Sequence, residues 1–453
     1  MISSVGSEHY LDRVGVTGSN PVSPTKKYTL LMNTYANLLL WVVPIFYLMI
    51  IIEIAYGHYK QNQTYKLMDT IASLSSGSTN LLKDILGLTL IIISYPFLLT
   101  HLSFFEIESN FWVYLIAFIC IDFSSYWNHR LNHKINIFWN QHVIHHSSEE
   151  FNLACALRQS ISNFLGYGAL FLIPAAIFGI PHSVIVVLLP LHLFGQFWYH
   201  TRHIGKLGIL EYIFVTPSQH RVHHAINPVY IDKNLGGIFC VWDRWFGTFQ
   251  EELDDEPPVY GVLKPVSTWN PILINFTHVW GLILDFFRTK SLKEKFLLWF
   301  MPTGYRPKDV IDKYPINKID DVHNFNKYSP PHNYFTKSWV LFHWLCTNIL
   351  VFYFLAKFSK FDANQSLIFC GIIFISIFSY SAVMDGYKWA YKLDLFRNLI
   401  GLFLLLIPSQ FEFYNTNLFY LLSFGIIYFT VGTISSIILN LNLRSKYIKV
   451  KKI

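Results

Sequence analysis

A succession of long apolar runs constrains this chain more than any other feature of its sequence. A helix of about 20 apolar residues is long enough to cross the hydrocarbon core of a bilayer. Only 14% of the 453 residues are charged, whereas about 25% is usual in soluble proteins, and this balance suits lipid. The sequence therefore predicts an all-α integral membrane protein with about nine transmembrane helices. They are predicted near residues 35–55, 85–102, 111–126, 161–180, 183–199, 338–356, 366–383, 395–407 and 418–439.

Lysine and arginine residues between the runs predict how the chain is oriented. They gather in the loop that holds Lys60, Lys66 and Lys83, in the long interval 202–337, and in the C-terminal tail 444–452. Because cytoplasmic loops are enriched in these residues, we expect the N-terminus outside and the C-terminus in the cytoplasm. This topology also accounts for the net charge of +7, so we expect no nucleic-acid partner.

The first 31 residues are polar and lack the apolar core of a secretory signal. The tetrapeptide Gly18-Ser19-Asn20-Pro21 can be encoded by the T-arm of a transfer RNA gene. We therefore interpret residues 1–31 as a non-native extension before a start at Met32, or else as a disordered arm. The first interpretation favours a bacterial inner membrane over the endoplasmic reticulum.

The rest of the chain is predicted to form three parts. The first holds five of the apolar runs and the histidine motifs described next. The second is mostly polar, with an amphipathic patch at 279–301 that predicts an interfacial or surface helix. The parts are a catalytic domain at 32–257, a cytoplasmic or interfacial segment at 258–337, and a four-helix transmembrane region at 338–453.

Histidines spaced as H-x-x-x-H and H-x-x-H-H follow the third and the fifth runs. Positions i, i+3 and i+4 share one face of a helix, so each motif can aim two or three imidazoles at one point. The runs 161–180 and 183–199 form a hairpin that returns the chain to the cytoplasmic side, where both groups can meet. The motif histidines are His129, His133, His142, His145, His146, His220, His223 and His224.

Imidazoles without thiolates indicate zinc, iron or copper, and the five cysteines lack C-x-x-C spacing. A catalytic ion takes about three protein ligands and keeps a position open, so eight histidines predict two metals. We expect His200, at the end of the fifth run, to be a ninth ligand. Asp122, Glu149 and Glu150 are predicted to accept the second N–H groups of ligand histidines.

A two-metal site at the membrane surface faces both water and acyl chains, so its predicted substrate is a lipid. Oxidation of an unactivated C–H bond needs a strong oxidant, which iron and dioxygen supply. A metal transporter or sensor is the alternative from another class of protein. Transporters, however, hold ionisable ligands near the bilayer midplane, whereas these histidines are predicted at helix ends.

The segment 122–252, which carries the motifs, resembles the fatty acid hydroxylase and sterol desaturase superfamily of membrane di-iron enzymes. The resemblance extends to Arg158-Gln159-Ser160, Asp232-Lys233-Asn234 and Trp242-Asp243, and it is closest to the members that oxidise alkylglycerols. One departure is Gln219, where a histidine is expected before His220. The resemblance implies that the eight motif histidines, with His200, hold a catalytic non-haem di-iron centre.

The resemblance also implies hydroxylation of the carbon next to the ether oxygen, with release of a fatty aldehyde and a glycerol derivative. Dioxygen would be the oxidant and tetrahydrobiopterin the electron donor. Hydroxylation or desaturation of a sterol or an acyl lipid by the same iron chemistry stays open as an alternative.

Overall fold

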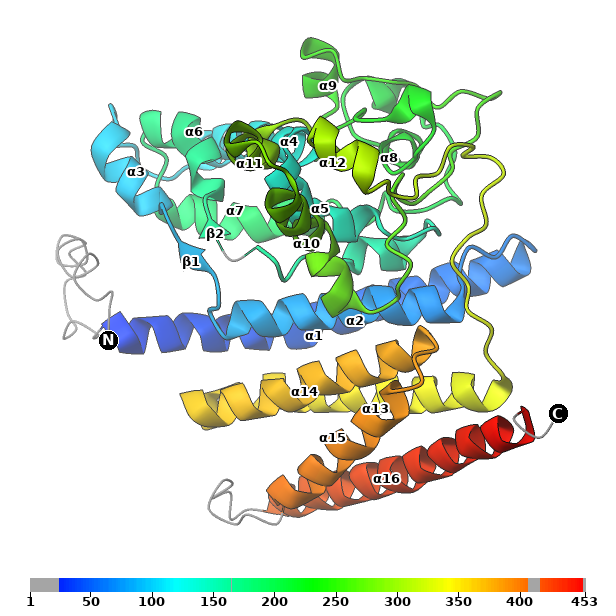
Figure 1. The fold of residues 1–453 in the computed structure, drawn as a ribbon. Coiled ribbons are helices and arrows are strands. Elements are labelled where there is room, and N and C mark those ends of the chain that lie inside the picture. The colour runs from blue at the N-terminus through cyan, green and yellow to red at the C-terminus, as the bar shows by residue number, and fades with distance from the viewer. Residues whose placement is uncertain (1–23, 164, 406–415, 451–453) are drawn as a thin grey trace.

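The computed structural model describes residues 24–163, 165–405 and 416–450 and is built mainly from helices (Figure 1). Residues 1–23 of the expected N-terminal extension lie outside this part of the chain, and helix α1 begins at Pro24. The long helices form layers, with α1 (Pro24–Tyr59) and α2 (Leu67–Ile85) between a group of shorter helices and a C-terminal bundle. The bundle consists of α13 (Tyr334–Lys357), α14 (Ala363–Met384), α15 (Ala390–Leu405) and α16 (Thr416–Val450).

Four helices in the described part of the chain are long and apolar enough to cross a membrane. Local signals fix where two of them begin: Asn333 caps α13, and Asp362 forms a capping box with Gln365 at the start of α14. The prediction of an α-helical membrane protein therefore holds, but nine crossings are not confirmed. The four candidate spans are Met32–Tyr59, Tyr334–Lys360, Ala363–Met384 and Leu422–Leu441.

The predicted runs 85–102 and 161–180 are not continuous helices, which corrects the sequence-based count. The first contains an extended stretch and only the eight residues of α3 (Tyr95–Leu102), a rise of about 12 Å against the roughly 30 Å of a bilayer core. The second contains the strand β2 (Leu165–Gly166), the 3-10 helix η3 (Gly168–Leu172) and α6 (Ile173–Ile177). Strand β1 (Leu90–Ile91) pairs with β2 in parallel, so backbone pairing replaces helix in both runs.

Each of these short elements precedes a longer helix, α4 (Phe111–Lys134) or α7 (His182–Phe194); α4 packs against α7, and α3 packs against α6. Gly179 turns the chain between α6 and α7 with a φ of +73°, and a Cβ there would lie 1.9 Å from the Phe105 carbonyl oxygen. Only glycine fits this close approach. The hydroxyl of Tyr95 donates to the Ile180 carbonyl at 2.7 Å and ties α3 to the same turn.

A single apolar core joins α2 to the C-terminal bundle. Ile71 and Leu82 of α2 pack with Phe354 of α13 and with Ile373 and Ile377 of α14, all at most 2% exposed. The bundle also buries an ion pair within α15, between Asp394 and Arg397 at 2.7 Å. Arg397 donates further to Tyr428 of α16 at 2.6 Å and to Nδ1 of His343 of α13 at 3.0 Å. Charged groups in such a place must be paired, and these pairs hold three helices together.

The segment between residues 258 and 333 contains three further helices. Helix α10 (Pro271–Arg288) packs against α2 and against α5 (Asn136–His146), and it is followed by α11 (Leu292–Phe300) and α12 (Lys308–Lys313). The amphipathic patch predicted at 279–301 is thus two helices, broken at Thr289. Shorter elements complete the chain: η2 (Leu153–Leu157), η4 (Gly208–Tyr212), α8 (Pro217–His223), η5 (Pro228–Tyr230), α9 (Val241–Trp245) and η6 (Phe358–Lys360).

Candidate metal centre

Four structural elements carry the predicted histidine ligands. The C-terminal turns of α4 hold His129 and His133, and only one residue, Ile135, separates the end of α4 from the start of α5. This sharp junction lets α5 direct His142, His145 and His146 back toward α4. The chain after α7 supplies His200, and α8 with its C-terminal cap supplies the remaining ligands, which are His220, His223 and His224.

The nine histidines lie in two groups, in each of which one ring nitrogen per residue lies within 4.8 Å of the others. His200 joins the second group, as the sequence predicts. The five-histidine group consists of His129, His133, His142, His146 and His223, and the four-histidine group of His145, His200, His220 and His224.

The ring nitrogens within each group converge at the spacing of metal ligands. Nε2 of His129 lies 2.8 Å from Nε2 of His142, and in the second group Nε2 of His200 lies 2.8 Å from Nε2 of His220. Nitrogens bound at about 2.1 Å to one ion at right angles would lie about 3 Å apart. The two groups therefore have the shape of two adjacent coordination spheres.

Backbone carbonyl groups determine which ring nitrogen is free to bind a cation. Nδ1 of His129 faces the Leu235 carbonyl oxygen at 2.9 Å, Nδ1 of His200 faces Gln196 O at 3.0 Å, and Nδ1 of His223 faces Lys233 O at 3.0 Å. A nitrogen that donates to a carbonyl carries the ring proton, so Nε2 of these rings presents a bare lone pair. Lone pairs crowded together in this way repel one another unless a cation lies between them.

Burial favours neutral imidazoles throughout the centre. It lowers the pKa of His129 to about 3, with the neighbouring His133 adding to the effect, and it lowers the pKa of His200 to about 3. The pKa of His145 and of His220 is also well below the ordinary value, chiefly through burial. Neutral imidazole is the form that binds a metal, so the site needs no deprotonation at neutral pH.

These pKa shifts predict that the metal-free protein loses stability in mild acid. Below about pH 6.5 the unfolded chain binds protons at its histidines, whereas His129 and His200 stay neutral in the folded chain down to about 3. The free energy of unfolding should therefore fall as the pH is lowered from about 7 to about 5. Thermal unfolding of the detergent-solubilised apoprotein at several pH values measures this. The metal-loaded protein should be more stable than the apoprotein at each pH, and an apoprotein of constant melting temperature would contradict the prediction.

The carboxylates predicted to support the ligands bind elsewhere, and this part of the prediction is wrong. Asp122 accepts hydrogen bonds from Nε2 of His192 at 2.7 Å, from the Ile238 amide and from the Trp242 indole. The carboxylate of Glu149 accepts from the backbone N–H of Tyr328 at 2.5 Å, and Glu150 pairs with Lys66 at 2.6 Å. Carbonyl oxygens fill the expected role instead. Through its hydrogen bonds to Ile238 and Trp242, Asp122 holds the loop whose Leu235 carbonyl faces His129.

One carboxylate that sequence reasoning missed does contact a predicted ligand. Oδ1 of Asp232 lies 3.3 Å from Nδ1 of His133, and Oδ2 pairs with Lys134 at 2.7 Å. Asp232 is 99 positions from His133 in the sequence, so spacing alone does not predict this contact. The one sequence feature that could have pointed to Asp232 is its place in the Asp232-Lys233-Asn234 motif.

Replacing Asp232 by glycine should weaken metal binding by the five-histidine group about 10- to 100-fold, because His133 loses the acceptor that orients its ring. Glycine is chosen since Asp232 has a φ of +58°, which glycine adopts freely. Competition with a chelator measures the affinity. The same change at Asp254, whose side chain is 99% exposed, is the matched control. Equal affinity in the two variants would exclude the role.

Gln219, the departure from the expected pattern, does not lie in either histidine group. Its side-chain amide donates to the Glu211 carbonyl at 2.7 Å, and its backbone carbonyl accepts from Asn234 at 3.0 Å. The glutamine at this position therefore leaves both histidine groups intact.

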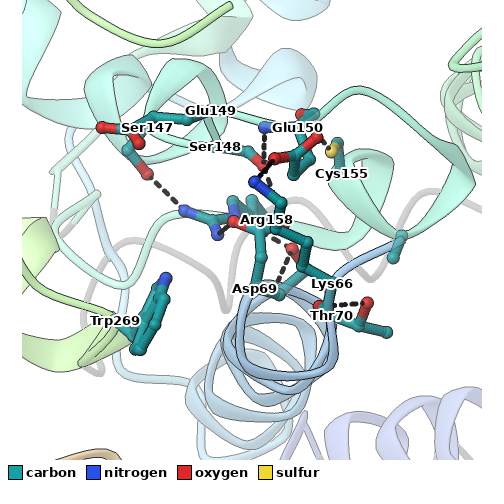
Figure 2. A network of polar contacts seen from close by, with 12 residues as sticks. Lys66, Asp69, Thr70, Ser147, Ser148, Glu149, Glu150, Cys155, Arg158 and Trp269 are labelled. Carbon is teal, nitrogen blue, oxygen red and sulfur yellow. Dashed lines mark hydrogen bonds and ion pairs between the residues drawn. The ribbon is translucent and has the colours of Figure 1, made fainter. Parts of the chain in front are cut away.

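A buried ion pair anchors the end of α5, just after His145 and His146 (Figure 2). Arg158 and Asp69 of α2, 2% and 5% exposed, lie 2.5 Å apart. Arg158 also donates to the hydroxyl of Ser147 at 2.8 Å, and Ser148 donates to Asp69 at 2.8 Å. The two serines directly follow His146, so this network connects the histidine helix to the long-helix layer.

A cavity of about 720 Å³ borders both histidine groups. It reaches His129 and His142 of one group and His145, His200 and His220 of the other, and it extends between α1, α7 and α13. Its size is that of a small-molecule or lipid site. The candidate metal centre is thus accessible from a space that membrane-type helices help to enclose.

Comparisons with known proteins agree with this arrangement. The family model described as fatty acid hydroxylase matches residues 114–248. The alkylglycerol monooxygenase of Xenopus tropicalis is 32% identical over 392 residues, which cover 86% of this chain and 85% of that protein. The human alkylglycerol monooxygenase is 39% identical over 243 residues, 53% of this chain and about half (54%) of that protein. The ornithine lipid hydroxylase OlsE of Rhizobium tropici is 29% identical over 135 residues, 30% of this chain and 41% of that protein. No solved structure matches.

Proposed function

Because the chain belongs to the alkylglycerol monooxygenase family, a group of lipid oxidoreductases, we propose that it is a membrane di-iron enzyme that oxidises alkylglycerols. In the proposed reaction the carbon next to the ether oxygen gains a hydroxyl group from dioxygen. The second oxygen atom leaves as water, with two electrons and two protons from a donor of the tetrahydropterin class. The resulting hemiacetal breaks down to a fatty aldehyde and free glycerol or its derivative.

The observation that carries this proposal is that nine histidines form two groups at a cavity, and that apolar helices line the same cavity. Their donor set, imidazole without thiolate, suits iron, and two groups suit two ions. When bound, the iron pair supplies the oxidising power that dioxygen needs to attack an unactivated C–H bond. The chain's own part is to hold neutral imidazoles in place and to keep the reacting carbon in the cavity beside them.

We also propose that the histidine groups face the cytoplasm, with the N-terminus outside and the C-terminus inside, in a bacterial inner membrane. The first turn of α1 and the last turn of α16 lie at opposite ends of the long-helix layers, which supports termini on opposite sides (Figure 1). Protease accessibility of tags at the two termini in sealed vesicles tests the orientation.

The direct test uses the purified full chain in detergent micelles. We expect about two iron ions per chain, one for each histidine group, and oxygen-dependent release of aldehyde from 1-O-hexadecylglycerol that requires tetrahydrobiopterin. Absence of iron would overturn the proposed chemistry. Turnover of sterols or acyl lipids, but not of alkylglycerols, would instead support the alternative substrates.

A further inference from the structure

The outward face of α10 is apolar, whereas its inward face buries polar groups. Phe276, Trp280 and Phe287 recur on the outward face at spacings of four and seven residues and are 36%, 59% and 73% exposed. The inward face buries the amide of Asn275 and the carboxylate of Asp285 beside two aliphatic residues. A surface helix of a soluble protein has the reverse arrangement. The outward face of α10 therefore suits an apolar environment.

Helix α11 continues this apolar surface. Leu292, Phe296 and Phe300 follow one another at intervals of four residues on one side of the helix and are at least 70% exposed. The rings of Phe286 and Trp299 lie 6.2 Å apart between centroids and join α10 to α11. We call the six exposed apolar residues of the two helices the α10–α11 face. Such a concentration of exposed apolar surface marks a contact site for lipid or protein.

Basic side chains edge the α10–α11 face where the two helices meet. Among residues 288–295 four are basic and one is acidic, namely Arg288, Lys290, Lys293 and Lys295 against Glu294. The carboxylate of Glu294 accepts a hydrogen bond from the hydroxyl of Tyr305, and the ammonium of Lys295 lies 5.2 Å from the ring centre of Phe286. Apolar surface edged by cations matches a leaflet that contains anionic lipids. A symmetric contact with a second copy would instead bring two basic edges together.

The direction of α10 agrees with a place at the membrane surface. The candidate spans in α1, α13 and α14 run along the long-helix layers. Figure 1 shows α10 rising from the layer of α1 and α2 toward α11, at a steep angle to these long helices. Because a helix that runs across the direction of the membrane spans follows the plane of the membrane, α10 can lie along a leaflet.

We propose that the α10–α11 face is seated in one leaflet of the membrane that the long helices cross. Its aromatic side chains lie at the acyl boundary, and its lysines lie at anionic head groups. The partner is thus a lipid surface that contains phosphatidylglycerol or another lipid of the same charge. The inference does not depend on the proposed reaction, because it concerns helices outside both histidine groups.

The inward side of the same two helices is fixed to the histidine helix α5. Nε2 of His278 lies 2.8 Å from the Asn136 carbonyl oxygen, and the backbone N–H of Val279 donates to Asn140 at 2.9 Å. From α11, the Leu298 carbonyl accepts from the side chain of Asn136 at 2.9 Å. Seating of the α10–α11 face in a leaflet therefore holds the histidine helix at one depth relative to the lipids.

The test measures the depth of a nitroxide label on the full chain in nanodiscs of phosphatidylcholine and phosphatidylglycerol. The label is attached in Phe296→Cys or in Trp280→Cys, and the five native cysteines are buried. Asp254→Cys, at a side chain that is 99% exposed, is the matched control. We expect both labels on the α10–α11 face to collide more with oxygen, which dissolves in lipid, than with a water-soluble nickel chelate. The control label should show the reverse.

Two results would overturn the proposal. Free contact of either label with the nickel chelate, as in Asp254→Cys, would place its helix in water. Protection from both oxygen and the chelate would show that protein covers the face, and a doubled protein mass per nanodisc would then identify a second copy. Neither result depends on turnover, so a failure here is distinct from a failure of the proposed monooxygenase activity.

The basic edge is tested with the triple variant Lys290→Gln, Lys293→Gln and Lys295→Gln. Without these changes, the ratio of oxygen to nickel collisions in Phe296→Cys should be about twofold higher with phosphatidylglycerol present than in phosphatidylcholine alone. The triple variant should lose this difference, whereas Lys206→Gln, at an exposed lysine outside the face, should keep it. A ratio that does not respond to phosphatidylglycerol, or a response that survives the triple change, would refute the role of anionic lipid.

Discussion

The replacement of His145 by alanine is expected to abolish turnover, by a factor of about one hundred or more. His145 belongs to the four-histidine group, and its Nε2 lies 3.4 Å from Nε2 of His200. Removing one of four imidazoles would open the coordination sphere of one iron ion, and the proposed reaction needs both ions of the pair. Aldehyde release and iron content, measured on the same preparation, report the loss.

The matched control is His323→Ala, because this side chain is 47% exposed and pairs with Glu256 outside both histidine groups. Both variants should accumulate in the membrane fraction like the wild-type protein, since neither change removes apolar surface from a candidate span. Wild-type activity in His145→Ala would refute its role as a ligand. A similar loss in both variants would mean that the assay reports damage unrelated to the metal.

Breaking the ion pair between Asp69 and Arg158 should have the largest effect on stability. Arg158→Met leaves the carboxylate of Asp69 buried without its partner, which typically costs about 3–5 kcal/mol of the free energy of unfolding. Iron occupancy should fall as well, because the network fixes the chain just after His145 and His146. Denaturant unfolding in detergent and metal analysis measure the two effects.

The double variant Asp69→Leu with Arg158→Met should recover much of the lost stability, since it leaves no unpaired charge. If the network positions the histidine helix, iron occupancy should stay low in this variant despite the recovered stability. Recovery of both stability and iron occupancy would show that the Asp69–Arg158 pair contributes to stability alone and does not position the histidine helix. Lys206→Ala, which removes an exposed pair with Glu251, is the surface control and should cost less than about 1 kcal/mol.

The grouping of the histidines could be predicted from the sequence because their spacing is a local feature. Spacings of three and four residues place imidazoles on one helix face, whatever the surroundings. His200 could be added because it follows an apolar run that ends near the motifs. The two runs that are not helices could not be predicted in this way, because hydropathy records which residues are apolar and not whether the backbone continues as a helix.

The support of the ligands was predicted wrongly for a related reason. Asp122, Glu149 and Glu150 are close to the motifs in sequence, but contacts in the fold engage them elsewhere. Carbonyl groups at Lys233, Leu235 and Gln196 supply the acceptors, and a backbone carbonyl leaves no trace in residue identity. Asp232 is distant in sequence from His133, so only the folded chain reveals their contact.

The carbonyl acceptors also bear on how the protein is made. All nine histidines, with the acceptors at Lys233 and Leu235 and the Asp122 contacts that hold their loop, lie between residues 122 and 242. A ribosome completes this stretch long before it reaches α13. The two histidine groups can therefore assemble on the nascent chain while the helices of the C-terminal bundle are still unsynthesised.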